Sequence, residues 1–320
     1  MWLSLLATLA SASLSQAGCF QGLCSDYSFD LAEVSNADWM AKIPDSIDIS
    51  ALSIPGTHNS LTEHLVSFKL IQSQNTNLKT QLESGIRYID VSGRLNYDSI
   101  QIFHGNGYTN SDLDDVLTVA FDFLDKHTQE AIIMRIHKDT ILSGQNEEFE
   151  RAVSSLLASD SDLGRRAKDR VYSRGREGIF WAPKLGELRA KILILQDFTT
   201  DYPGLFGIPW RSDGMVVSNW KAIPGHIALS IKWSIVKHAL KNANTDKKPR
   251  LHITHSSVSA GATPFKAAAG RKLDRTGMND YLGRYLAKGK LQRTGIISMD
   301  FPGKELVAQI IKRNEQFYKS

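Results

Sequence analysis

The chain contains 320 residues, of which 42% are hydrophobic, so it is long enough to bury one large core or two modest ones. Its formal net charge is +4, but it carries no long Lys/Arg run and no basic stripe interleaved with aromatic residues, and we therefore expect no nucleic-acid partner. The mild positive charge suits anionic phosphate groups or an anionic membrane surface.

Residues 1–17 have the form of a secretory signal peptide. An apolar stretch runs from Trp2 to about Leu9, and small residues follow, with Ser15 and Ala17 just before a cleavage point. The alternative is a buried N-terminal helix, which the shortness of the stretch disfavours. A permanent membrane anchor needs about 20 apolar residues, and no later segment supplies them. We therefore expect a secreted protein with neither a transmembrane helix nor a lipid-anchor tail.

Residues 18–38 form a short N-terminal segment that holds both cysteines of the chain. In a secreted protein, the adjacent pair Cys19 and Cys24 indicates one small disulfide. A metal site is disfavoured because there is no further Cys and no His lies nearby. Cysteine chemistry is therefore excluded as the activity of this protein.

Beyond residue 38, short β-branched runs alternate with longer amphipathic stretches. We expect strands at residues 51–55, 86–95, 100–104, 131–137, 191–197, 214–218, 250–255 and 294–300. We expect helices at residues 75–84, 111–127, 147–158, 223–241, 276–288 and 304–318, the second of them with Ser111 as its N-cap.

This alternation predicts an α/β fold in which residues 39–320 form one domain, a TIM-type β/α barrel, in preference to an open sheet. The connection between residues 95 and 100 is too short for a helix, so we expect the barrel to be distorted. In such barrels the chemistry gathers at the C-terminal ends of the strands.

Ionisable side chains do gather at the ends of the expected strands. Residues at alternate positions of a strand share one face, which brings several of these side chains together. They are His58, Asp90, Ser92, Arg94, His104, Arg135, His137, Asp139 and Asp300.

Two carboxylates in this set need an explanation. Asp90 lies between Ile89 and Val91, and Asp300 also follows an apolar run, so each must find a partner when it is buried. A hydrogen bond between His58 and Asp300 would give both residues the partner that they need.

The histidines also have structural interpretations. Alone, His58 could be a cap or surface residue, and His104 could be a satisfied residue at a strand end. We interpret the other histidines as surface or structural residues, with His255 the least certain; they are His64, His127, His226, His238, His252 and His255.

Several blocks of the sequence resemble the X region of phosphatidylinositol-specific phospholipases C, in particular the small secreted bacterial type. The similar blocks are ISALSIPGTHNSLT, GIRYIDVSGRL followed by FHG, and AIIMRIHKD, within an X-type region at about residues 48–195. The resemblance extends upstream to DWMAKIPDSIDI and downstream to LGELRAKILILQDF, HITHSSVSAGATPF and GIISMDF. It implies a distorted TIM-like barrel.

The resemblance also implies a mechanism. His58 would be the general base that removes the proton of the inositol 2-hydroxyl, whose oxygen attacks phosphorus in line. His104 would be the general acid that protonates the departing diacylglycerol oxygen, and Asp300 would orient the base. The product would be a cyclic inositol phosphate. Histidine suits both roles because its ordinary pKa is about 6.5.

At three positions the chain departs from the family pattern. The bacterial type has Arg at the position of Ser92, and the calcium-dependent type has a carboxylate there. The position of His137 would be Lys in one type and a carboxylate in the other. Asn59 matches a metal ligand of the calcium-dependent type, whereas the bacterial type has Asp there, which supports the acid.

These departures leave open how the charge on the phosphoryl oxygens is stabilised. Either Arg94 or Arg135 could reach the phosphate, which is the hypothesis that we prefer and which needs no cofactor. Alternatively, a calcium ion could be held by Asn59, Asp90 and Asp139. In the third case the protein would bind inositol phosphate head groups without rapid turnover.

Other features concern the substrate and the membrane. Asn219 and Trp220 occupy positions where the family places head-group contacts, and residues 206–210 could form a loop that contacts the membrane transiently or could be packed. We expect a monomer that acts on phosphatidylinositol or on glycosyl-phosphatidylinositol anchors. A barrel enzyme for other phosphodiesters, such as glycerophosphodiesters, would normally need several carboxylates to hold a metal.

Overall fold

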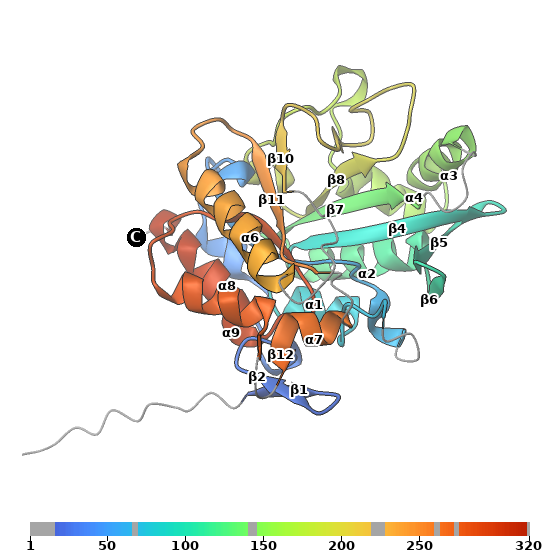
Figure 1. Cartoon of the computed structure of the whole chain (residues 1–320). Helices are drawn as coiled ribbons and strands as arrows, with labels where there is room; N and C mark the ends of the chain where they lie inside the picture. Colours follow the sequence, from blue (N-terminus) through green and yellow to red (C-terminus); the bar gives the residue numbers. More distant parts are fainter. Residues whose placement is uncertain are drawn as a thin grey trace, which may run out of the picture.

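The core of the molecule is a curled parallel sheet with helices on its outside (Figure 1). The computed structural model describes residues 17–65, 70–139, 146–218, 228–258, 263–271 and 275–318. Neighbouring strands of the sheet pair in parallel along the path β10-β11-β14-β3-β4-β7-β8-β9. These strands are β3 (Ser53–Thr57), β4 (Tyr88–Asn96), β7 (Ala131–Lys138), β8 (Lys191–Asp197), β9 (Ile208–Pro209), β10 (Met215–Val217), β11 (Leu251–His255) and β14 (Gly295–Met299).

This sheet confirms the distorted barrel that the sequence predicts. Each of the predicted strands has a counterpart within a few residues of its expected bounds. Within the described part of the chain no pairing joins β9 to β10, so the barrel stays open at that seam. An antiparallel ribbon of β5 (Ser99–His104) and β6 (Gly107–Asp112) extends from β4 and precedes the helix that leads to β7.

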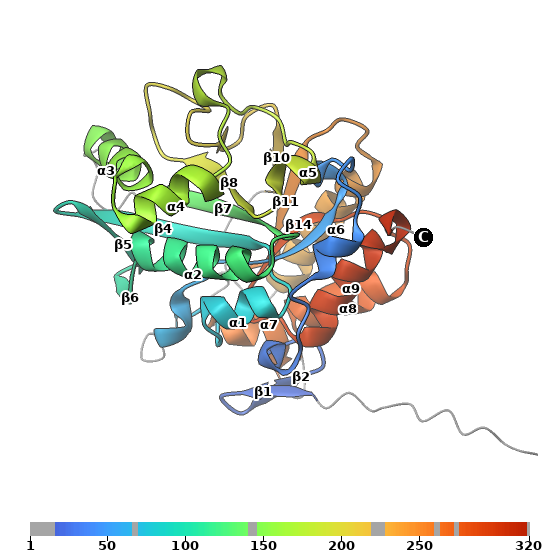
Figure 2. The ribbon, with the colours of Figure 1, turned by 180° about the vertical axis from the view of Figure 1, so that it is seen from behind.

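Figures 1 and 2 show the helices in two groups on the outside of the sheet, one beside β11, β14 and β3 and one beside β4, β7 and β8. The first group consists of α6 (Ala228–Thr245), α7 (Pro264–Ala269), α8 (Met278–Ala287) and α9 (Lys304–Lys312). The second consists of α1 (Leu78–Glu83), α2 (Leu113–Lys126), α3 (Asn146–Ala158), α4 (Asp162–Arg170) and α5 (Leu185–Leu188).

The predicted start of one helix was wrong, and three helices were not predicted: α4, α5 and α7. Helix α2 begins after Asp112 and not after Ser111, because Ser111 belongs to β6 and Asp112 caps the helix in a reciprocal arrangement with Asp115. Helix α4 was missed because most of its residues are charged and it buries only Gly164 and Ala167, so its sequence has too few apolar residues to mark a buried face.

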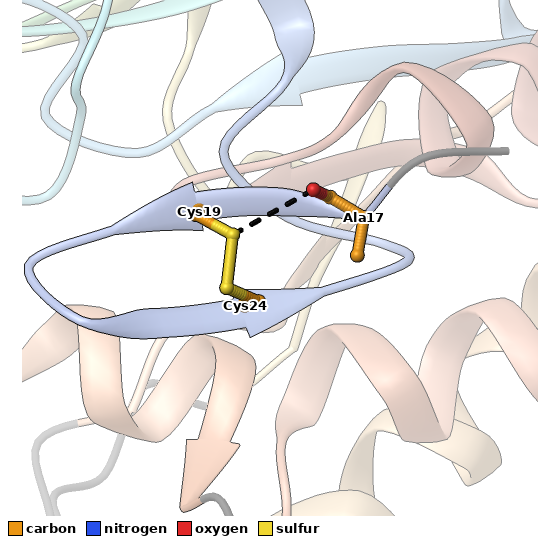
Figure 3. Close-up of a disulfide and its surroundings, with 3 residues drawn as sticks. All are labelled: Ala17, Cys19 and Cys24. Carbon is orange, nitrogen blue, oxygen red and sulfur yellow. Dashed lines mark hydrogen bonds between the residues drawn. A yellow bond between two sulfur atoms is a disulfide. The ribbon is translucent and has the colours of Figure 1, made fainter.

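The N-terminal segment forms a small hairpin, β1 (Gly18–Phe20) with β2 (Leu23–Ser25), and the predicted disulfide closes it (Figure 3). The hairpin lies beneath α7 in both ribbon views. Residues 1–16 of the predicted signal peptide lie outside the described residues. Among the helices described, none is long and apolar enough to cross a bilayer.

A buried ion pair ties the start of β4 to the loop before β7. Arg87 and Glu130 are both fully buried, and the Nε atom of Arg87 donates to Glu130 Oε2 over 2.8 Å. Arg87 also donates to the carbonyls of Leu82 and Ala37, and its guanidinium lies 4.5 Å from the ring centroid of Phe123. Every strong donor group of this cation therefore has a partner inside the core.

Replacing Glu130 by Gln should lower the free energy of unfolding by about 3–5 kcal/mol, because it leaves the buried Arg87 charge without its counter-ion. Urea unfolding at neutral pH measures the effect. The matched control is Asp162→Asn, which removes an acid from an exposed pair with Arg165 and should cost less than about 1 kcal/mol. Similar losses of unfolding free energy in the two variants would show that the buried ion pair stabilises the fold no more than the exposed pair does.

Candidate active site

A cavity of about 350 Å³ lies at the C-terminal ends of the parallel strands. It is there because the side chains that follow each strand converge at one end of a barrel. Its walls come from nearly every strand of the sheet. The lining residues are His58, Asn59, Asp90, Ser92, His104, Gly105, Arg135, His137, Asp139, Trp210, Arg211, Val217, Ser218 and His255.

His58 follows β3 and forms the predicted pair with Asp300, which follows β14. The Nδ1 atom of His58 lies 2.9 Å from Asp300 Oδ1. Because a carboxylate can only accept, Nδ1 carries the proton, and in the neutral ring Nε2 then carries the lone pair. The side chain of His58 is 12% exposed and lines the cavity, and its Nε2 accepts a hydrogen bond from Asn59.

His104 stands at the end of β5, and its ring centroid is 6.0 Å from that of His58. Its Nδ1 donates to the carbonyl oxygen of Ile71 over 2.7 Å, which leaves Nε2 as the variable nitrogen. Burial lowers the pKa of His104, and the charge of a protonated His58 lowers it further. The neutral form is therefore favoured until a negative charge enters the cavity.

Asn59 lies between the two imidazoles. Its Nδ2 atom is 3.1 Å from His58 Nε2 and 3.0 Å from His104 Nε2, so one amide nitrogen donates to both lone pairs. The backbone of Asn59 is left-handed, with φ of 44°, a conformation that Asn tolerates better than most residues. An ionised Asp here, as in the bacterial pattern, would accept hydrogen bonds where Asn donates them.

Arg135 of β7 is held in the cavity by two carboxylates and an aromatic ring. Its Nη1 donates to Asp90 Oδ1 over 2.9 Å and its Nε to Asp197 Oδ2 over 2.9 Å, and its guanidinium lies 4.4 Å from the Trp210 ring centroid. Burial acts to raise the pKa of Asp90, but Arg135 and nearby histidines outweigh it and hold that pKa below its ordinary value. The partner that Asp90 was expected to need is therefore Arg135.

The parallel register of β4 and β7 places the unusual residues next to each other. Ser92 is opposite His137, two residue pairs beyond the pair of Asp90 and Arg135 and on the same face of the sheet. The Nδ1 atom of His137 lies 3.0 Å from Asp197 Oδ2. Ser92 thus leaves open space beside Arg135 where the bacterial pattern has a second arginine.

Arg94, the other candidate for binding phosphate, is engaged elsewhere and does not line the cavity. Its Nε donates to Asp139 Oδ2 over 3.0 Å, its Nη2 donates to the carbonyl oxygen of Gly105, and its guanidinium lies 4.4 Å from the Phe103 ring centroid. These contacts fix the end of β5, directly beside His104. The geometry therefore favours Arg135 over Arg94 as the cation that faces a ligand.

The residues proposed to hold calcium do not fit that ion. Asp90 is paired with Arg135 at 2.9 Å, and Asp139 is paired with Arg94 at 2.8 Å, so both carboxylates already neutralise a guanidinium. Asn59 faces the imidazoles through its nitrogen. The described side chains include no group of three or more His, Cys, Asp or Glu residues that could hold a metal.

Several residues in or beside the cavity were not among the predicted site residues. Asp197 and His255 each end a strand, so the rule that located His58 could have identified them. His255 is buried, and its ring centroid is 6.2 Å from that of His58, so our interpretation of it as a surface or structural residue was incomplete. Trp210 and Arg211 follow β9 in a segment whose position only the fold determines.

Of the two interpretations left open for residues 206–210, a membrane-contacting loop or a packed segment, the structure supports the packed segment. Phe206 is buried, with its ring 5.6 Å from that of Phe198, and Ile208 is fully buried in β9. Trp210 packs on Arg135. The predicted head-group residues Asn219 and Trp220 lie outside the described residues.

The fold and the site together define a β/α barrel with two histidines in a cavity at its strand ends, and comparisons with known proteins specify its family. Residues 49–197 match the model of the "Phosphatidylinositol-specific phospholipase C, X domain". The 1-phosphatidylinositol phosphodiesterase of Listeria monocytogenes is 30% identical over 294 residues, which cover 88% of this chain and 86% of that protein. The enzyme of the same name from Staphylococcus aureus is 23% identical, over 91% of this chain and 98% of that protein.

Solved structures agree with these sequence matches. The phosphatidylinositol-specific phospholipase C of Listeria monocytogenes superposes with a TM-score of 0.75 at 28% identity, over 88% of this chain and 100% of that chain. A mutant of the Staphylococcus aureus enzyme gives a TM-score of 0.69 at 22% identity, which shows the shared fold. The chain belongs to the phosphatidylinositol-specific phospholipase C family.

A buried lysine lies behind the site. Lys232 of α6 is 2% exposed, and α6 packs on β11 and β14, the strands that end at His255 and Asp300. Burial lowers the pKa of Lys232 from 10.5 to about 8, although the charge of Asp300 acts in the opposite direction. A cation at this position costs stability at neutral pH.

Replacing Lys232 by Met should raise the free energy of unfolding by about 2 kcal/mol at pH 7, an order-of-magnitude figure. Between pH 8 and 10.5 the unfolded chain holds this proton while the folded chain has lost it, so the wild type gains stability as pH rises. The advantage of the variant should therefore shrink by pH 9.5 in urea unfolding. A gain in unfolding free energy that is the same at pH 7 and pH 9.5 would contradict this account. An equal gain in the exposed control Lys241→Met would also contradict it.

Proposed function

We propose that this protein is a phosphatidylinositol phosphodiesterase that uses His58 as general base and His104 as general acid. The observation that carries the proposal is the pairing of His58 with Asp300 at 2.9 Å, directly across a cavity from His104. The names of the Listeria and Staphylococcus relatives specify the same substrate. Glycosyl-phosphatidylinositol anchors share the phosphodiester and are a second substrate in this proposal.

The base step follows from the tautomer of His58. Its Nε2 lone pair takes the proton of the inositol 2-hydroxyl while Nδ1 keeps its hydrogen bond to Asp300. The carboxylate then stabilises the imidazolium that forms. The 2-oxygen bonds to phosphorus as the bond from phosphorus to the diacylglycerol oxygen breaks, which gives a cyclic inositol phosphate without a covalent enzyme intermediate.

The acid step needs His104 to be protonated at Nε2. In the empty site, burial and His58 hold the pKa of His104 below its ordinary value. A phosphodiester carries a negative charge, and its entry between the two rings raises the pKa of His104. The substrate thus promotes protonation of its own acid, which then donates to the departing diacylglycerol oxygen.

Arg135 is our candidate for stabilising the phosphoryl oxygens in place of the arginine that Ser92 replaces. Asp90, Asp197 and Trp210 fix its guanidinium before substrate arrives, so little reorganisation is needed during the reaction. Arg211 lines the same cavity, and the described contacts give it no ion pair, so it supplies a second positive charge at the cavity wall. His137 and Ser92 complete the phosphate side.

The remaining parts of the proposal concern cofactor and location. The engaged state of Asp90 and Asp139 supports a reaction that needs no calcium. The signal-peptide pattern at residues 1–17 supports secretion. A secreted enzyme of this class would contact the lipid surface transiently, and we propose that it acts as a monomer.

The decisive experiment measures release of cyclic inositol phosphate from phosphatidylinositol vesicles with EGTA or with added calcium. We expect turnover to survive EGTA and to fall about 10²–10⁴-fold in His58→Ala, because the variant loses general base catalysis. The control is His238→Ala, an exposed histidine on α6, which should stay within about twofold of the wild type.

Turnover that appears only with calcium would contradict the metal-free mechanism. A folded protein without turnover in any condition would favour a head-group binding protein instead. Release of a glycosyl-phosphatidylinositol-anchored protein from membranes, measured in parallel, tests the second substrate.

A pair of variants distinguishes the two arginines. Arg135→Lys should lower kcat about 10²-fold, because lysine keeps the charge but loses the planar guanidinium that Asp90 and Asp197 hold at the cavity wall. Arg94→Lys should lower kcat by less than about tenfold, since Arg94 acts only by holding the end of β5. Steady-state kinetics measures kcat of both variants, and thermal unfolding checks that each is folded. A loss of kcat in Arg94→Lys that equals or exceeds the loss in Arg135→Lys would overturn the assignment to Arg135.

A further inference from the structure

The disulfide-closed hairpin lies against the segment that carries Asp300. Cys19 and Cys24 are on the exposed side of the hairpin (Figure 3), while Phe20 faces inward. The ring centroid of Phe20 lies 5.4 Å from that of Phe301, 5.5 Å from that of Phe29 and 5.9 Å from that of Phe265. Phe301 is the residue next to Asp300, and it is fully buried.

Two members of this aromatic cluster have unfavourable backbones. Phe301 has φ of 46° and Phe29 has φ of 79°, and their ring centroids are 5.7 Å apart. A bulky residue in the left-handed region costs roughly 1–2 kcal/mol, so the surrounding structure must hold it there. Phe20 packs on both rings and supplies part of that support.

Hydrogen bonds join the same two segments. The backbone N–H of Phe29 donates to the carbonyl of Phe301 over 3.3 Å, and that of Gly303 donates to Tyr27 over 2.9 Å. Asn279 donates from Nδ2 to the carbonyls of Asp300 and Phe301 over 3.0 and 3.1 Å. The hairpin lies so close to the segment that contains Ser28 and Phe29 that a Cβ on Gly18 would lie 2.2 Å from the carbonyl oxygen of Ser28.

We propose that the hairpin of residues 18–25 is a positioning element for the catalytic base, in which Phe20 holds Phe301 and thereby Asp300 against His58. The disulfide keeps the two short strands together so that Phe20 stays over the cluster. The proposal rests on the proposed function for its kinetic consequences. Its structural consequence, the hydrogen bond from His58 to Asp300, stands apart from activity.

The physical reason is that a hairpin of two three-residue strands has little stability of its own. Without the Cys19–Cys24 bond, Phe20 is held only by its packing. Phe301 then loses one of its ring neighbours, and its left-handed backbone is free to relax. A shift of about 1 Å in a catalytic group is enough to cost about 10²-fold in rate.

The test uses the full mature protein and three perturbations. These are Phe20→Ala, the double variant Cys19→Ser with Cys24→Ser, and the wild type after dithiothreitol has reduced the disulfide to two thiols. Each should lower kcat on a short-chain phosphatidylinositol about 10–100-fold with KM nearly unchanged. The matched control is Phe180→Ala, an exposed aromatic residue outside the cluster and the cavity, which should stay within about twofold of the wild type.

A double-mutant cycle separates positioning from general loss of structure. In an Asp300→Asn background, Phe20→Ala should cost less than about twofold, because its effect acts through the carboxylate that is already gone. The same fold-loss in both backgrounds would overturn the proposal. Dithiothreitol should have no effect on the cysteine double variant, and an equal effect there would also count against it.

A second readout needs no activity. A hydrogen-bonded imidazole Nδ1–H gives a protected low-field proton signal, which we expect for His58 in the oxidised wild type and expect to be lost in Phe20→Ala. Thermal unfolding confirms that the variant is folded. Retention of the signal together with a wild-type kcat would overturn the proposal. A wild type that shows the signal but no turnover would refute the proposed function alone.

Discussion

The catalytic arrangement depends on one constraint, the parallel pairing of β3 with β14. The register aligns Thr57 with Met299, and the backbone N–H of His58 donates to the Met299 carbonyl over 2.9 Å. His58 and Asp300 therefore leave the sheet side by side. Gln74 donates from Nε2 to the carbonyls of His58 and Met299, so a single buried amide holds both strand ends together.

The other half of the acid–base pair belongs to a different part of the architecture. His104 ends a strand of the antiparallel ribbon, which leaves the barrel where a crossover helix would normally follow β4. Arg94 and Ile71 fix the end of that ribbon from two sides. His58, the proposed base, is thus positioned by paired strands of the barrel. His104, the proposed acid, is positioned by contacts to the β5–β6 ribbon that extends from the barrel.

The electrostatics of the cavity favour an anionic ligand. Asp90 and Asp197 are committed to Arg135, and burial lowers the pKa of His255 to about 3, so that ring stays neutral. The groups that can still respond to a ligand are cationic or protonatable. A phosphodiester is therefore the kind of ligand that completes the charge balance of this site.

Much of this site could be predicted from the sequence, because an ionisable residue that directly follows an apolar run indicates the end of a strand. That rule identified His58, His104 and Asp300, and the need to pair a buried carboxylate indicated the bond between His58 and Asp300. The choice between Arg94 and Arg135 could not be predicted. Both point from the same sheet face, and only the neighbours that each one meets distinguish them.

Other features depend on contacts that no local pattern encodes. Trp210 and Arg211 reach the cavity because β9 pairs with β8 for only two residues and then turns. The apolar residues before them resemble an exposed loop in sequence but are packed by that pairing. The role of the N-terminal hairpin likewise depends on Phe301, a partner that is distant in sequence and close in space.

The pairing of β3 with β14 also has a consequence for how the enzyme comes into being. His58 and Asp300, which form this hydrogen-bonded pair, are separated by 242 positions in the sequence, nearly the whole length of the barrel. Contacts of such long range form late in folding and slowly. A nascent chain on the ribosome therefore carries its imidazole long before its carboxylate exists. The hydrogen bond between His58 and Asp300 therefore cannot form until β14 and the residue after it have been synthesised.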